Sequence, residues 1–116
     1  MTVFIFHITS RASWSDAQKT GLYIADSSKQ DGFIHCSKSD QILRVANTFY
    51  RNQIGLVILE IDPSKLISEL RWEPGTDKAD ELFPHIYGSL NLEAIVHVFN
   101  FEPDPNGMFS LPAEIR

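Results

Sequence analysis

Residues 3–10, with the sequence VFIFHITS, decide how the fold begins. The β-branched and aromatic residues of 3–8 predict a strand near the start of the chain. Thr9 or Ser10 can cap a following helix, because a hydroxyl accepts a hydrogen bond from the exposed amides of a first helical turn. The helix is expected to run to about Thr20 and to end at Gly21, which adopts a left-handed turn without steric cost. The first unit is therefore a strand that passes directly into a helix.

The remaining sequence predicts one more helix and several short strands. We expect a loop at 26–32, a strand at 33–36, a helix from Ser37 or Ser39 to about Arg51, strands at 56–61, 70–73 and 95–101, and a short edge strand at 109–111. The apolar run at 56–61 indicates a central strand. Residues 83–92 contain Pro84 and Gly88 and predict a structured turn. Helices come early and strands late, so the expected class is α+β, with small mixed or antiparallel sheets and two helices in the N-terminal half.

Length, charge and cysteine content limit the kind of protein. The chain has 116 residues, which predicts a single domain over 1–116. Its net charge of −5 argues against a general nucleic-acid binder, although an RNA end or another phosphate-sized ligand remains compatible. The lone Cys36 and the lack of a long apolar run favour a cytoplasmic protein that is not embedded in a membrane.

Two short motifs have the same form, a histidine followed two residues later by a hydroxyl. His7-Ile8-Thr9 ends the first expected strand, and His35-Cys36-Ser37 ends the second. Side chains two apart on an extended backbone point to the same side, so each histidine should lie beside its hydroxyl. If the two strands present these faces to one cleft, the imidazoles can divide acid and base roles and the hydroxyls can bind ribose or phosphate oxygens.

A third polar cluster lies in the expected turn, at residues 83–91. His85, Tyr87 and Asn91 would suit a ligand-binding loop, since loops on a rigid scaffold often carry sites. The alternative is structural: Asn91 caps the turn that follows it, and Tyr87 packs.

Other candidates are structural. His97 has no polar partner at its spacing, and Cys36 should point into the core. Arg44 and Arg51 lie seven apart on a helix face that is either solvated or able to contact phosphate. We expect no metal site, because no pair of histidines has the spacing of helical ligands. Trp72 fits the core or the wall of a site.

The chain resembles, over almost its whole length, a family of small bacterial proteins known as domain of unknown function 952. The resemblance rests on residues 5–9, 32–37, 59–62, 70–73, 83–88 and 90–92, in the same order and spacing. It implies a fold like that of the ADP-ribosyltransferase superfamily, whose members bind NAD in a cleft between two small sheets. In that superfamily a first-strand histidine and a hydroxyl hold the NAD ribose and nicotinamide. His7 and Thr9 match this pattern, with Ile8 in place of the usual glycine. The third catalytic position of the protein-modifying members is a glutamate; Glu73 is nearest to it in type, while residues 85–91 are richer in polar groups.

These observations together give one functional expectation and two alternatives. We expect a cleft that binds NAD or a related ADP-ribosyl or phosphorylated nucleotide, with ADP-ribosyltransferase-like or RNA 2′-phosphotransferase-like group transfer. The expected catalytic residues are His7, His35 and His85, and the expected cofactor-binding residues are Thr9, Ser37, Tyr87 and Asn91. One alternative is a two-histidine phosphoesterase. The other is a non-catalytic nucleotide-binding or protein-interaction domain.

Overall fold

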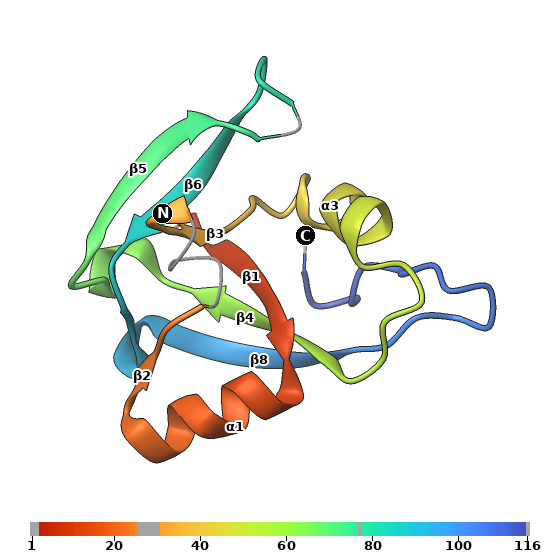
Figure 1. The fold of residues 1–116 in the computed structure, drawn as a ribbon, viewed down its shortest axis with the longest axis horizontal. Helices are drawn as coiled ribbons and strands as arrows, with labels where there is room; N and C mark the ends of the chain where they lie inside the picture. The colour runs from red at the N-terminus through yellow and green to blue at the C-terminus, as the bar shows by residue number, and fades with distance from the viewer. Residues whose placement is uncertain (1–2, 26–30, 77, 116) are drawn as a thin grey trace.

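The computed structural model describes residues 3–25, 31–76 and 78–115. Within these residues the chain forms three small antiparallel sheets and two helices in the N-terminal half, so the expected α+β class is confirmed. Figure 1 shows how these elements are arranged. The strands are β1 (Ile5–Ser10), β2 (Leu22–Tyr23), β3 (Ile34–His35), β4 (Leu56–Ile61), β5 (Glu69–Pro74), β6 (Leu82–Tyr87), β7 (Leu90–Asn91) and β8 (Ile95–Phe101), and the helices are α1 (Arg11–Thr20) and α3 (Ile42–Phe49), with short 3-10 turns at Pro63–Lys65 and Leu92–Ala94. Of the loop expected at 26–32, residues 26–30 lie outside the described part of the chain.

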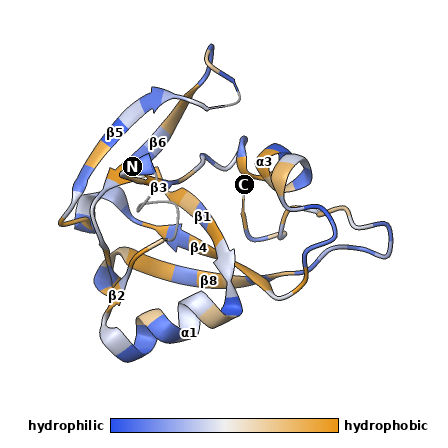
Figure 2. Ribbon diagram, viewed as in Figure 1, coloured by the Kyte–Doolittle hydropathy of each residue, from blue (hydrophilic) through white to orange (hydrophobic). Residues whose placement is uncertain are grey.

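The largest core lies on both faces of the sheet with strand order β1-β4-β8. β4 is central, as its apolar sequence predicts, and pairs antiparallel with β1 and β8. One face packs against α1, β3 and β6, and the other packs against α3 and the C-terminal segment. Figure 2 shows the hydrophobic colour concentrated on these strands and the hydrophilic colour on much of α1.

The first strand passes directly into α1, as expected, although it starts and ends two residues later than the expected 3–8. Ser10 caps the helix: its Oγ accepts a hydrogen bond from the Ser13 amide at 3.0 Å. Gly21 ends the helix with a φ of 88° in the left-handed region. Ala17 belongs to the core on this face of the sheet, and Trp14 packs against it.

The turn expected at 83–92 is wrong for residues 83–87, because Leu82–Tyr87 form β6, the central strand of the sheet β3-β6-β5; the chain bends at Gly88, between β6 and β7. Pro84 lies inside that strand opposite Trp72. Proline cannot donate to a ladder but can accept, and the Pro84 carbonyl accepts from the Cys36 amide at 3.0 Å. The regular pairing with β3 ends at His35, one residue before the position that would need the missing donor. β6 therefore tolerates Pro84 because its regular pairing with β3 ends there.

The second helix begins later and ends earlier than expected. Neither Ser37 nor Ser39 caps it; the N-cap residue is Gln41, whose Oε1 accepts from the Lys38 amide at 2.9 Å. Ser37 instead forms a β-bridge with Phe6, which occupies its backbone. Residues 109–111 form no strand. Phe109 packs on Phe101 with ring centroids 4.5 Å apart, and its amide bonds to Asn47 at 2.7 Å.

None of the described helices is long and apolar enough to cross a membrane.

Candidate active site

The two histidine motifs meet although their strands belong to different sheets. The amides and carbonyls of Phe6 and Ser37 bond to each other in both directions at 2.8 Å. One residue further along β1, the ring of His7 donates from Nδ1 to the carbonyl of His35 at 2.5 Å, since a carbonyl can only accept. The predicted convergence is therefore real, but it joins the ring of one histidine to the backbone of the other.

His7 is enclosed and uses both ring nitrogens. Its Nε2 lies 2.7 Å from the Tyr23 hydroxyl, which also lies 2.8 Å from Thr9 Oγ1. His7 and Thr9 thus point to the same side of β1, as their spacing predicts. Burial lowers the pKa of His7 from 6.5 to about 4, against the opposing effect of the bond to the His35 carbonyl. At neutral pH His7 is an uncharged ring that accepts a hydrogen bond from Tyr23 and holds β1 against β3.

The second motif is open where the first is closed. The Nε2 of His35 bonds to Asp31 at 2.8 Å, and the side chain is 37% exposed. Within the described residues neither His35 Nδ1 nor Ser37 Oγ makes a hydrogen bond, and both residues line a cavity. Cys36 points into the core, as expected, and burial raises the pKa of its thiol.

His85 joins this group from β6, where it pairs directly with His35 across the ladder. The two rings are 5.4 Å apart in an edge-to-face arrangement, and Phe33 stacks on His85 at 4.0 Å. Its Nδ1 lies 2.8 Å from Glu73 Oε1, which also accepts from the Tyr87 hydroxyl at 2.6 Å. The bonds from Tyr87 and His85 hold the pKa of Glu73 below its usual range. Nε2 of His85 is left without a hydrogen bond among the described residues.

We call the cavity that these groups share the first cavity; its volume is about 390 Å³. Its polar lining consists of the three histidines together with Ser37 and Thr76, and its apolar walls come from α3 and from the β5–β6 hairpin: Val45, Phe49 and Tyr50 on one side, Gly75 and Phe83 on the other. Figure 1 shows α3 and this hairpin on opposite sides of β3. A Cβ on Gly75 would lie 2.6 Å from the Phe83 ring. The absence of a side chain at residue 75 therefore allows the Phe83 ring to pack directly against the backbone of the hairpin.

A hydrogen-bonded clasp holds the two walls together. Glu81, at the hairpin, accepts from Gln41 at 2.7 Å and from Arg44 at 2.9 Å, and Gln41 also donates to the Leu82 carbonyl at 2.9 Å. The bonds from Arg44 and Gln41 hold the pKa of Glu81 below its usual range. Arg44, on the exposed face of α3, therefore forms an ion pair with Glu81. These bonds set the distance between α3 and the hairpin.

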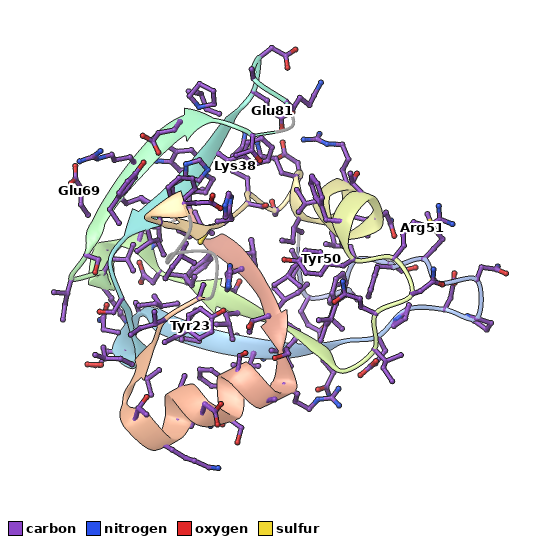
Figure 3. The ribbon with its side chains drawn as sticks, viewed as in Figure 1. Tyr23, Lys38, Tyr50, Arg51, Glu69 and Glu81 are labelled. Carbon is purple, nitrogen blue, oxygen red and sulfur yellow. The ribbon has the colours of Figure 1, made fainter. Side chains whose placement is uncertain are left out.

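A second cavity of about 250 Å³ adjoins the first. Both are lined by His7 and Tyr50, and the second also contacts Thr9, Ser10, Ser13 and Gln53. The Tyr50 hydroxyl makes no hydrogen bond within the described residues, and burial raises its pKa. Figure 3 labels Tyr23 and Tyr50, the two tyrosines that line this second cavity. Tyr50 thus offers a hydroxyl between the two cavities.

Not every residue expected at the site reaches the first cavity. Asn91 accepts from the Ile67 amide at 3.2 Å and donates to the Lys65 carbonyl at 2.9 Å, so its side chain holds a loop. Tyr87 contacts the site through Glu73, and Thr9 lines only the second cavity. His97 is exposed on β8 and stacks on Phe99 at 4.4 Å. Trp72, which the sequence could not place, is 43% exposed.

Sequence reasoning missed the tyrosines and the aromatic walls. Tyr23 belongs to no motif, and only the fold brings it to His7. Tyr50 lies in the segment expected to be a helix, and Phe83 in the segment expected to be a turn. The one available signal for Tyr50 is the helical spacing of the apolar residues Ile42, Leu43, Ala46, Phe49 and Tyr50, which places it on the same side as the others. Among the described residues, no three His, Cys, Asp or Glu side chains are grouped to hold a metal ion.

Among the described residues the first cavity is lined by no Lys, Arg, Asp or Glu and is walled by aromatic side chains, which is the kind of cavity that takes a small organic ligand. Residues 8–98 match the sequence family described as "Protein of unknown function (DUF952)", and the chain belongs to that family.

A solved structure gives the same fold. The chain is 31% identical to protein CC0527 from Caulobacter crescentus, whose X-ray structure superposes with a TM-score of 0.83 over 93% of this chain and 94% of that one. The solution NMR structure of CC0527 gives a TM-score of 0.78 over 90% of both chains, at 31% identity. No curated protein matches the chain.

Proposed function

We propose that the protein binds NAD or a related ADP-ribosyl or phosphorylated nucleotide in the first cavity and transfers an ADP-ribosyl or phosphoryl group. One observation carries the proposal: three polar atoms without a partner among the described residues, His35 Nδ1, His85 Nε2 and Ser37 Oγ, belong to residues of a single apolar-walled cavity. Polar groups left open in such a cavity are the usual means of orienting a ligand.

The hydrogen bonds of each histidine indicate which one has a structural role and which ones can act on a ligand. His7 has no free nitrogen, so it positions the His35 strand and takes no part in proton transfer. His35 and His85 each have one ring nitrogen bonded to a carboxylate and one left open. In this arrangement the carboxylate orients the ring, and the open nitrogen is available for acid–base chemistry. Aromatic side chains on opposite walls, Phe49 and Phe83, suit a flat base.

For ADP-ribosyl transfer from NAD, the bond between ribose C1′ and nicotinamide breaks and its electron pair leaves with nicotinamide. A hydroxyl acceptor then bonds to C1′ and gives its proton to His35 or His85. The resemblance to ADP-ribosyltransferases directs the choice of NAD as the first compound to test, and fold analogy alone does not decide the reaction.

The paired histidines favour a second candidate, hydrolysis of a phosphodiester such as a 2′,3′-cyclic nucleotide. Their rings are 5.4 Å apart, so both can reach one phosphate group. One ring would take a proton from the attacking water as the new P–O bond forms. The other would give a proton to the ribose oxygen that leaves.

A calorimetric and thermal-shift screen tests both candidates, with NAD, ADP-ribose, nicotinamide and 2′,3′-cyclic nucleotides as probes. A ligand at 100 times its dissociation constant adds about 2.7 kcal/mol of stability, which such a screen resolves. His35→Gln should abolish the shift, and His97→Gln, on the exposed face of β8, should leave it unchanged. A shift with NAD or ADP-ribose supports the first candidate, and one with cyclic phosphates alone supports the second. No shift with any probe would overturn both.

A further inference from the structure

We propose that the ligand is anchored by a terminal phosphate, a phosphomonoester held by His35, His85 and Ser37 and attached to a group with a flat ring. This inference rests on the proposed function and names the chemical class of ligand for the same cavity.

The charges around the cavity support a histidine-bound anion. No Lys, Arg, Asp or Glu is among the described residues that line the first or the second cavity. Arg44, near the Phe83 wall, is already paired with Glu81 at 2.9 Å. His7 is uncharged and bonded at both nitrogens. Among the described lining residues, His35 and His85 are therefore the groups that can balance the charge of an anion, and each open nitrogen donates to it only when the ring is protonated at both nitrogens.

The number of donors distinguishes one kind of phosphate from another. A terminal phosphate has three free oxygens and a charge of about −1.5 to −2 at neutral pH. A phosphate inside a pyrophosphate bridge has two free oxygens and one charge. Thr76 and Tyr50 also line the cavity, but His35 Nδ1, His85 Nε2 and Ser37 Oγ belong to neighbouring residues, since His35 pairs with His85 across the ladder and Ser37 follows two residues later. These three groups can each bond to one oxygen of a terminal phosphate. The fourth oxygen of the phosphate, which links the phosphorus to the rest of the ligand, would point toward the aromatic walls.

The two carboxylates strengthen this arrangement by orienting the imidazoles. Asp31 and Glu73 each accept from a ring nitrogen at 2.8 Å, so both rings are held with the opposite nitrogen left for the ligand. Phe33 contacts both rings, stacking on His85 at 4.0 Å and lying 4.6 Å from His35. The anchor is thus built before the ligand arrives, which reduces the entropy lost on binding.

Isothermal calorimetry with five probes tests the inference: adenosine 5′-monophosphate (AMP), NAD, adenosine, ribose 5-phosphate and inorganic phosphate. We expect AMP to bind at least about tenfold more tightly than NAD or adenosine, because charge-assisted hydrogen bonds to a terminal phosphate are lost in both. Ribose 5-phosphate should bind more weakly than AMP, because it lacks the ring that contacts Phe49 and Phe83.

Variants show whether the phosphate is bound where we place it. His35→Gln and Ser37→Ala should weaken AMP binding by about tenfold to a hundredfold. His97→Gln and Ser39→Ala, which alter residues outside both cavities, should leave it unchanged. His35 is partly exposed, so its variant is expected to fold even if a variant of the buried His85 does not.

Each outcome decides a different point. If NAD binds as tightly as AMP, or if AMP binding survives both His35→Gln and Ser37→Ala, the phosphomonoester anchor is wrong while the proposed nucleotide site stands. If ribose 5-phosphate binds as tightly as AMP, the flat ring is wrong. If none of the nucleotides binds, the inference and the proposed function both fail.

Discussion

His7-Ile8-Thr9 and His35-Cys36-Ser37 have the same pattern of residues and opposite surroundings. The first histidine is 6% exposed, bonded at both nitrogens and neutral, and its hydroxyl partner bonds to Tyr23. The second is partly exposed, bonded at one nitrogen, and followed by a hydroxyl without a partner among the described residues. The comparison teaches that a motif defines which groups are present, whereas the packing around it decides whether they serve the scaffold or a ligand.

Substitution of the two histidines should give the largest difference in stability between the two motifs. His7→Ala should destabilise the protein by about 3 kcal/mol, because it leaves a cavity and removes hydrogen bonds to the His35 carbonyl and Tyr23. His35→Ala should cost less than about 1 kcal/mol, since it removes a partly exposed ion pair. Urea unfolding of both variants, with His97→Ala as control, measures the difference. Equal losses would show that the first motif is no more structural than the second.

The pH dependence of stability provides a second test of the buried, uncharged state of His7. The pKa of His7 falls from 6.5 to about 4 on folding, so between these values the unfolded chain binds more protons than the folded one. Stability should be full above pH 6.5 and should fall by about 3 kcal/mol as the pH drops toward 4. His7→Gln should remove this part of the pH dependence. The contribution is measured as the difference between the wild type and the variant in urea unfolding from pH 4.5 to 7.5, and identical pH profiles would contradict it.

The paired hydroxyls should separate stability from binding. Thr9→Val removes the bond to Tyr23 and should cost about 1 kcal/mol, with little change in ligand affinity. Ser37→Ala removes a hydroxyl without a partner among the described residues and should leave stability nearly unchanged while it weakens AMP binding. Denaturation and calorimetry on the two variants test this crossed result. A stability loss in Ser37→Ala with normal binding would reverse the assignment.

The smallest expected effect concerns the residue between His35 and Ser37. Burial raises the pKa of the Cys36 thiol, so the native protein should react slowly with iodoacetamide and rapidly once unfolded. Mass spectrometry of the alkylated protein with and without urea measures the ratio. Rapid alkylation of the native protein would show that the thiol faces the cavity.

Local signals predicted much of the fold because each has a local cause. Ser10 and Gly21 bound α1 through a cap and a left-handed turn, and the apolar run of β4 marked the centre of its sheet. β6 was missed because Pro84 and Gly88 are strong turn signals, and the missing donor of Pro84 is tolerated in the strand only because the regular pairing with β3 ends beside it. That compensation depends on residues far apart in the sequence.

The site was predicted only in outline for the same reason. Spacing placed His7 beside Thr9, but burial of His7 and its bond to Tyr23 depend on how α1 returns along β1. Asn91 and His85 are close in sequence, yet one holds a loop and the other lines the cavity. Residue type indicated which groups could bind a ligand, and only the three-dimensional arrangement separated those already used by the scaffold.

An NMR titration of the four histidine rings with AMP tests the central claim most directly. The account predicts that the ring resonances of His35 and His85 shift as AMP is added. It also predicts that His7 remains a neutral Nδ1-protonated ring throughout, and that His97 does not respond. A shift of His7 with His35 and His85 unchanged would contradict the account and make the first motif the site.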